Sequence, residues 1–316
     1  MAFRLFQKKD KTVNFIITDE AIHFVELRQV DPPIIEKAGE RTLPEGMIVR
    51  GDIARLDEFQ EVMDNLVDEW KLKNRTIRFT IPDRYVAIRE ETVDRDMTLD
   101  EIKNYFFMQI GSSIHLPFDE PVFDVVVTGV EEKKQTVLLV AAPEQIVQEY
   151  ASVFEHARLQ PVAADIAPLA VYRLFHAFGQ TDEHAHELLI HLKTNVMTLS
   201  IFHQNQLKFL KPVFIEKSED VLGLEEEEST GDLADALSEL DRVINFYENS
   251  VHGGQVKIER VLFSSHHPQR FFVEEYMKQS LDVQVMTDEL LEIETKQNER
   301  LAPAFFAAAG LALKDG

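Results

Sequence analysis

The hydrophobic pattern at the start of the chain predicts a β-hairpin followed by a helix and a strand. Residues 13–17 are mostly apolar, and the polar residues 18–20 separate them from a second apolar segment that begins at Ile22. Apolar residues at i, i+3 and i+4 spacing then predict a helix over residues 57–70, and an apolar run predicts a strand over 76–81. We therefore expect an α/β unit that opens with a hairpin.

The second half of the chain repeats this plan. A hairpin is expected over residues 188–202 with its turn at 193–195, and a third strand over 207–214. The pattern beyond it predicts, in order, a helix, a strand, a helix and a strand over residues 232–247, 260–264, 269–280 and 283–286. The chain thus looks like two related α/β halves.

Extra material lies between the two halves. The pattern predicts a compact β-α-β-β-α unit, with elements over residues 86–93, 99–110, 122–127, 136–141 and 144–157. We assign residues 10–81 to a first lobe, on which residues 161–180 and 300–316 are expected to pack. Residues 82–160 form an inserted subdomain and residues 187–299 a second lobe.

Composition narrows the possible partners and chemistry. With 33 Lys and Arg against 56 Asp and Glu, the net charge is −23, which argues against nucleic acid as a partner. The absence of cysteine removes disulfides, thiolate metal sites and cysteine nucleophiles, and fits a reducing cytosol. The longest apolar run, residues 301–313, is shorter than the roughly 20 residues that a transmembrane helix needs.

The N-terminus combines apolar and basic residues. Phe3 and Phe6 precede Lys8, Lys9 and Lys11, a combination that suits contact with an anionic membrane surface. The alternative is a loose chain end with no such contact.

Few residues outside this plan suggest catalysis or metal binding. His184, His186 and His191 lie close together in the sequence. The His-x-His pair at 184 and 186 suits a metal ion, but no further ligand lies at a spacing typical of a metal site, so we expect none. No nucleophile elbow, HExxH helix or P-loop occurs. Asp83 and Asp165 each follow or end a predicted strand, where a catalytic carboxylate can lie.

Four passages resemble the PilM family of actin-like type IV pilus assembly proteins. They are IGSSIHLPFDEPVFDVVV (110–127), TVLLVAAPEQIVQEYASVFEHARLQPVAADIAPLAVYRL (136–174), ADALSELDRVINFYENS (234–250) and LAPAFFAAAGLALK (301–314). The resemblance implies a two-lobed actin/Hsp70-like α/β fold with an inserted FtsA-like β-α-β-β-α subdomain, at the cytoplasmic face of the inner membrane. It also implies a junction role for Asp165.

The resemblance further implies three nucleotide-binding turns, two with a D-x-G motif and one with paired glycines. Glycine lets backbone N–H groups approach phosphates, and the aspartates hold Mg²⁺. This chain has other residues at these places: Ile16 and Thr18 in the first turn, His191 and Lys193 in the second, Ser265 and His266 in the third. We therefore expect no nucleotide or other cofactor and no enzymatic activity.

The function implied by the resemblance is that of a scaffold. PilM-like proteins hold the short cytoplasmic tail of the membrane protein PilN and contact other components of the pilus machine, so peripheral association with the membrane is expected. Pro117 and Phe118 lie in a predicted turn and either belong to the core or line a groove for that tail. The alternatives are an actin-superfamily ATPase and an FtsA-like division protein; the degenerate turns disfavour the first. The second is disfavoured because no amphipathic membrane helix follows residues 301–314.

Overall fold

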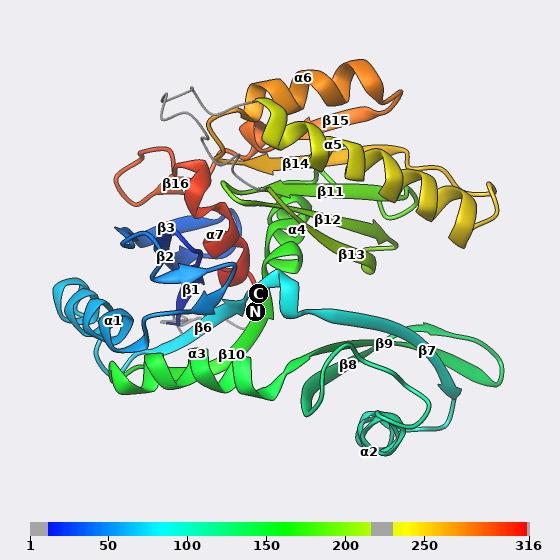
Figure 1. Ribbon diagram of the computed structural model, residues 1–316, viewed down its shortest axis with the longest axis horizontal. Helices are drawn as coiled ribbons and strands as arrows, with labels where there is room; N and C mark the ends of the chain where they lie inside the picture. Colours follow the sequence, from blue (N-terminus) through cyan, green and yellow to red (C-terminus); the bar gives the residue numbers. More distant parts are fainter. Residues whose placement is uncertain (1–11, 216–229, 315–316) are drawn as a thin grey trace, which may run out of the picture.

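The computed structural model describes residues 12–215 and 230–314, which form two lobes and a smaller sheet (Figure 1). The basic N-terminal segment with Phe3 and Phe6 lies outside the described residues. Across residues 12–215 and 230–314, none of the helices is both long enough and apolar enough to cross a lipid bilayer.

The first lobe is built on a six-stranded sheet. Its strand order is β10-β6-β1-β2-β3-β16, in which β1, β2 and β3 are antiparallel and β6 and β10 run parallel to β1. The strands are β1 (Val13–Ile17), β2 (Ala21–Gln29), β3 (Ile34–Thr42), β6 (Thr76–Ile81), β10 (Gln160–Ile166) and β16 (Glu294–Thr295). A two-stranded ribbon of β4 (Ile48–Val49) and β5 (Asp52–Ile53) precedes the first helix.

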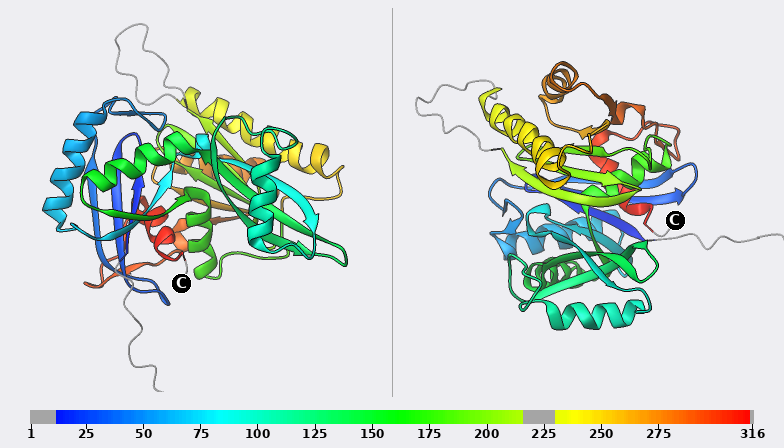
Figure 2. Two further views of the ribbon diagram at one scale, coloured as in Figure 1. Left: turned by 90° about the horizontal axis from the view of Figure 1, so that it is seen from below. Right: turned by 90° about the vertical axis from the view of Figure 1, so that its right-hand side faces the viewer.

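Helices cover both faces of this sheet. One pair is α1 (Leu56–Trp70) and α3 (Glu144–His156); the other is α4 (Ala167–Ala177) and α7 (Phe306–Ala312), which lies between the two large sheets (Figures 1 and 2). The second pair packs so closely that a Cβ atom on Gly310 would lie 1.9 Å from the carbonyl oxygen of Ala170. Only glycine fits this crossing.

The second lobe has a five-stranded sheet in the order β13-β12-β11-β14-β15. The strands are β11 (Glu187–Leu192), β12 (Val196–His203), β13 (Gln206–Phe214), β14 (Arg260–Ser265) and β15 (Gln284–Thr287). The helices are α5 (Thr230–Asn245), followed by a π-helical turn η2 (Phe246–Val251), and α6 (Arg270–Ser280). Short 3₁₀ turns η3 (Asp288–Leu290) and η4 (Pro303–Phe305) lead back to the first lobe.

A three-stranded sheet lies beside the first lobe (Figure 1). It is entered through the 3₁₀ turn η1 (Asp83–Tyr85) and has the order β7 (Ala87–Asp94), β9 (Lys134–Pro143), β8 (Pro121–Val130). The helix α2 (Leu99–Gln109) buries Ile102 and Phe106 in a separate hydrophobic cluster with these strands. A capping box between Thr98 and Glu101 starts this helix.

Two boundaries differ from those expected. The helix α3, assigned to the inserted subdomain, packs in the first lobe, where the Phe154 ring lies 5.2 Å from both the Phe15 and Phe79 rings. The strand β16, assigned to the second lobe, pairs with β3 of the first sheet. In both cases the local pattern specifies an amphipathic element, but the surface that buries it is chosen by the tertiary fold.

Candidate functional site

The structure brings the three predicted turns together in the cleft between the lobes. His191 on β11 lies close enough to Lys193 and His266 for both to affect its pKa. The His266 ring lies 6.4 Å from the ring of His23, which pairs with Ile16 across the first hairpin. The positions chosen from the sequence are therefore neighbours in space.

Ile16 and Thr18 have structural roles in the first hairpin. Ile16 is buried in the core of the first lobe. The Thr18 hydroxyl accepts a hydrogen bond from the backbone N–H of Ala21 at 3.1 Å and donates one to the carbonyl of that residue. These hydrogen bonds close the turn. Neither Ile16 nor Thr18 carries a carboxylate that could bind a metal ion.

Asp19, which the sequence analysis passed over, connects three segments at the mouth of this turn. Its carboxylate accepts hydrogen bonds from the backbone N–H groups of Arg50 at 2.6 Å and Gly51 at 2.9 Å. It also accepts one from the Asn195 side chain of the second lobe at 3.1 Å. In the sequence, the only feature that could have drawn attention to Asp19 was its position in a polar hairpin turn. The side chain ties the two lobes together.

Lys193, at the second turn, is paired with a carboxylate at the entry to the three-stranded sheet. Its Nζ lies 3.3 Å from Oδ2 of Asp83, to which the Thr198 hydroxyl also donates a hydrogen bond at 2.8 Å. Asp83 is 4% exposed. The sequence placed Asp83 at a strand end but did not predict this partner. A lysine charge that is balanced in this way is less available to attract a phosphate.

Three histidines in the cleft are held in the neutral form. Burial is the main cause that lowers the pKa of His191 well below its usual value, and Lys193 and His266 lower it further. Burial also lowers the pKa of His266 to about 4, assisted by the nearby His23, Lys193 and His267. Burial lowers the pKa of His23 despite its contact with Glu40. At neutral pH these rings add no charge to the cleft.

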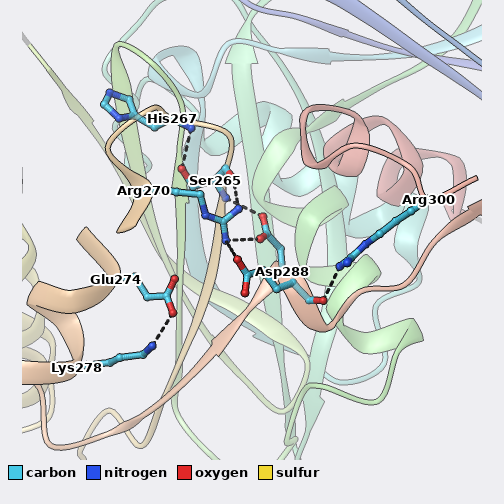
Figure 3. Close-up of polar contacts among 8 residues, drawn as sticks. Ser265, His267, Arg270, Glu274, Lys278, Asp288 and Arg300 are labelled. Atoms are coloured by element: carbon cyan, nitrogen blue, oxygen red, sulfur yellow. Dashed lines mark hydrogen bonds and ion pairs between the residues drawn. The ribbon is translucent and has the colours of Figure 1, made fainter. Parts of the chain in front are cut away.

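The third turn is held by an arginine and a buried aspartate (Figure 3). The backbone N–H of Ser265 donates to Oδ2 of Asp288 at 2.9 Å. Arg270 donates to Oδ1 of the same carboxylate and to the Ser265 carbonyl, both at 2.9 Å. Burial raises the pKa of Asp288, against the effect of these contacts. The turn is thus fixed by side chains of the second lobe.

A small cavity lies between the lobes at the two hairpins. It has a volume of about 50 Å³, and its lining includes Asp19, Arg50, Asp83, Arg84 and Lys193. A cavity of this size has room for a few waters. In this arrangement the cleft is a network of paired charges.

The other histidine cluster lacks the geometry of a metal site. His186 stacks on His203 at 3.9 Å and its Nδ1 lies 2.9 Å from the Tyr247 hydroxyl, while His184 is exposed. Over residues 12–215 and 230–314, no group of three or more His, Asp or Glu side chains is arranged to hold a metal ion.

A larger, apolar groove lies between the three-stranded sheet and the first lobe. Its volume is about 290 Å³, and β8, β9, α3, β10 and α4 supply most of its lining. Its lining includes Val122 and Val126 of β8 together with Ile166 and Leu169. The valine at 126 is 55% exposed, so apolar surface is available to another molecule.

The loop before β8 contains Pro117 and Phe118. Pro117 is exposed and Phe118 is half-buried. Neither side chain belongs to the lining of the groove, which includes Val122 and Phe123 of the following strand. Their contact with a partner tail stays a prediction.

Asp165 lies on the floor of the groove, at the end of β10. Its Oδ1 accepts a hydrogen bond from the backbone N–H of Ile166 at 2.8 Å. Its Oδ2 contacts Arg173 at 2.5 Å and Lys314 at 3.2 Å. The carboxylate therefore joins β10, α4 and the residue that follows α7, in agreement with a junction role.

Comparison with known proteins places these features in a family. The family described as type IV pilus assembly protein PilM matches residues 16–213, well over half of the chain. No curated protein matches. Among solved structures, the chain is similar to one in a PilM-PilN type IV pilus biogenesis complex, with 18% sequence identity, a TM-score of 0.80 and coverage of 97% of this chain and 98% of that chain.

Other solved structures are similar to the chain at lower scores. The ethanolamine utilization protein EutJ from Carboxydothermus hydrogenoformans has a TM-score of 0.49 and 10% identity over 96% of this chain and 89% of its own. A Bacteroides thetaiotaomicron protein with an actin-like ATPase fold and unknown function has a TM-score of 0.47 and 9% identity over 96% of each chain. The α/β actin-like fold expected from the sequence is confirmed. The chain belongs to the PilM family of type IV pilus assembly proteins.

Proposed function

We propose that this protein is a non-catalytic scaffold on the cytoplasmic face of the inner membrane, and that it holds the cytoplasmic tail of a PilN-like membrane protein. Membership of the PilM family supports a role in a pilus-type assembly machine. The similar solved structure is that of a PilM-PilN complex, which supports a partner of this kind.

The groove beside the three-stranded sheet is the observation that carries the proposal. It offers about 290 Å³ lined mainly by apolar side chains, enough for a few side chains of an extended segment. Burying one large apolar side chain contributes about 1.5–3 kcal/mol. Two or three such anchors would contribute about 3–9 kcal/mol before the cost of ordering the tail, so further contacts along the tail must add to the affinity.

The charge of the protein favours a tail with basic flanks. The net charge is −23, and the groove lining includes the carboxylates of Asp124 and Asp165. Opposite charges raise the rate of encounter, while the apolar contacts supply most of the affinity.

The interlobe cleft supports the non-catalytic part of the proposal. The carboxylates that border it are engaged with protein groups: Asp19 with Arg50, Gly51 and Asn195, and Asp83 with Lys193. Binding of Mg²⁺ and a triphosphate would require these contacts to break and the lobes to separate.

Two exposed valines of β8 provide a matched test. Val126 lines the groove and is 55% exposed, whereas Val130 lies outside the lining and is 59% exposed. A fluorescent peptide with the sequence of a PilN-like tail should bind the wild-type protein. Val126→Asp should weaken that binding about tenfold or more because a carboxylate is costly against apolar anchors. Val130→Asp should bind like wild type. Absence of binding to wild type, or equal loss in both variants, would contradict the proposal.

A further inference from the structure

We infer that Lys314 occupies, from within the same chain, a position that a cationic group of the partner tail takes when it binds. The inference rests on the proposed function, because it concerns the same groove. It assigns to Lys314, through its contact with Asp165, a role in the selection of the tail beyond the junction role of Asp165.

The first step is the geometry of the pair. Lys314 lines the groove, and its Nζ lies 3.2 Å from Oδ2 of Asp165. The Asp165 side chain is 3% exposed, whereas the Lys314 side chain is 30% exposed. A buried carboxylate on the groove floor is thus covered by a lysine that reaches solvent.

The second step is that Lys314 can leave at small cost. Without it, Asp165 keeps the Arg173 guanidinium at 2.5 Å and the backbone N–H of Ile166 at 2.8 Å. Arg173 also donates to the Gly310 carbonyl at 3.4 Å, which helps to hold it in place. The buried carboxylate therefore stays paired, so the usual penalty for an isolated buried charge does not arise.

The third step concerns the charge of the tail group that takes the place of Lys314. The charged side chains that line the groove are Asp124, Asp165 and Lys314. When Lys314 swings out, the lining loses its cation, while Asp165 keeps its contact with Arg173 and Asp124 keeps its contact with Lys103. A lysine, arginine or free amino group of the tail fits the vacated position, and a carboxylate does not.

The consequence is competition within one molecule. A tail with apolar anchors and a basic residue displaces Lys314, whereas a tail without a basic residue leaves the lysine over Asp165 and gains only the apolar contacts. Lys314 thereby lowers the affinity for every basic tail. Among these tails, only those whose apolar anchors are well buried still bind tightly.

The variant Lys314→Met tests this, because it keeps the length of the side chain and removes the charge. Two fluorescent peptides serve as probes: a PilN-like tail, and the same peptide with its Lys and Arg replaced by Gln. We expect Lys314→Met to bind the basic peptide about three- to tenfold more tightly than wild type and the Gln peptide with little change. Lys278→Met, which removes an ion-paired lysine of α6 in the second lobe, should change neither affinity.

The opposite results would overturn the inference. Weaker binding of the basic peptide by Lys314→Met would show that the lysine pairs with a carboxylate of the tail, and an unchanged affinity would show that it does not compete. In either case wild type still binds the tail, so the proposed function survives. If wild type binds neither peptide, the proposed function and this inference fall together. Asp165→Asn, with its fold checked by thermal unfolding, should lose the preference for the basic peptide; an intact preference would also overturn the inference.

Discussion

The interlobe cleft and the groove differ in how their polar groups are satisfied. In the cleft, carboxylates and cations of the two lobes pair with each other and leave a cavity of about 50 Å³. In the groove, mainly apolar side chains line about 290 Å³ of open space, and the charged residues of the lining are Asp124, Asp165 and Lys314. Paired buried charges specify one arrangement, while an open apolar surface accepts a segment from outside. The first region therefore holds the lobes together, and the second is available for a partner.

The largest expected effect comes from breaking the cleft network at Asp83. Asp83→Asn removes the charge opposite Lys193, whose side chain is 14% exposed, and leaves that cation unbalanced. We expect the free energy of unfolding to fall by about 3–5 kcal/mol, as found when one partner of a buried ion pair is removed. Urea denaturation measures it. The double variant Asp83→Asn with Lys193→Met should recover part of the loss; no recovery would mean that the pair does not account for the effect.

A second effect follows from the neutral histidines of the cleft. The folded protein holds the pKa of His266 at about 4, below the usual value of 6.5. Between these values the unfolded chain binds more protons than the folded one, so the stability contributed by neutral His266 is present above pH 6.5. It is lost as the pH falls toward 4, and amounts to at most about 3 kcal/mol.

Variants separate this contribution from the other titrating groups. His266→Gln should reduce the loss of unfolding free energy between pH 7 and pH 4.5, measured by urea denaturation at each pH. The matched control is His184→Gln, which removes an exposed imidazole outside the cleft. If both variants follow the wild-type curve, the cleft does not hold His266 neutral.

The smallest expected effect is that of nucleotide on the cleft. Titration calorimetry with ATP and Mg²⁺ should give no saturable heat below millimolar concentrations, because Ile16, Thr18 and His191 provide no carboxylate and the nearby carboxylates are engaged. A micromolar dissociation constant would show that the lobes open readily, and would remove the contrast between the two regions.

The sequence predicted the principal elements of both lobes but not all of the pairings between them. Both hairpins and the helix over 57–70 appear at or close to the expected positions, because hydrophobic periodicity reports local structure. The strand β3 was missed, since its outer part is rich in charged residues. The assignment of α3 to the inserted subdomain was wrong, because its apolar face does not reveal which sheet buries it.

For the candidate sites too, the sequence revealed local motifs but not the partners that lie far along the chain. The residues of the three turns were found from the sequence because a motif fixes their order along the chain. Their partners Asp83 and Asp288 come from other segments, and no spacing rule connects Asp83 to Lys193 over 110 residues. Pro117 and Phe118 are not among the residues that line the groove, whereas Val122 and Val126 of the next strand are.

By itself the sequence determined the family, the order of the elements, the absence of D-x-G at the expected turns and the acidic charge of the molecule. These are properties of composition and of short stretches of chain. The tertiary structure decided which charges pair in the cleft and that the apolar groove is open with Lys314 over Asp165. Such features depend on side chains brought together from distant segments, where burial and charge pairing act through space and not along the chain.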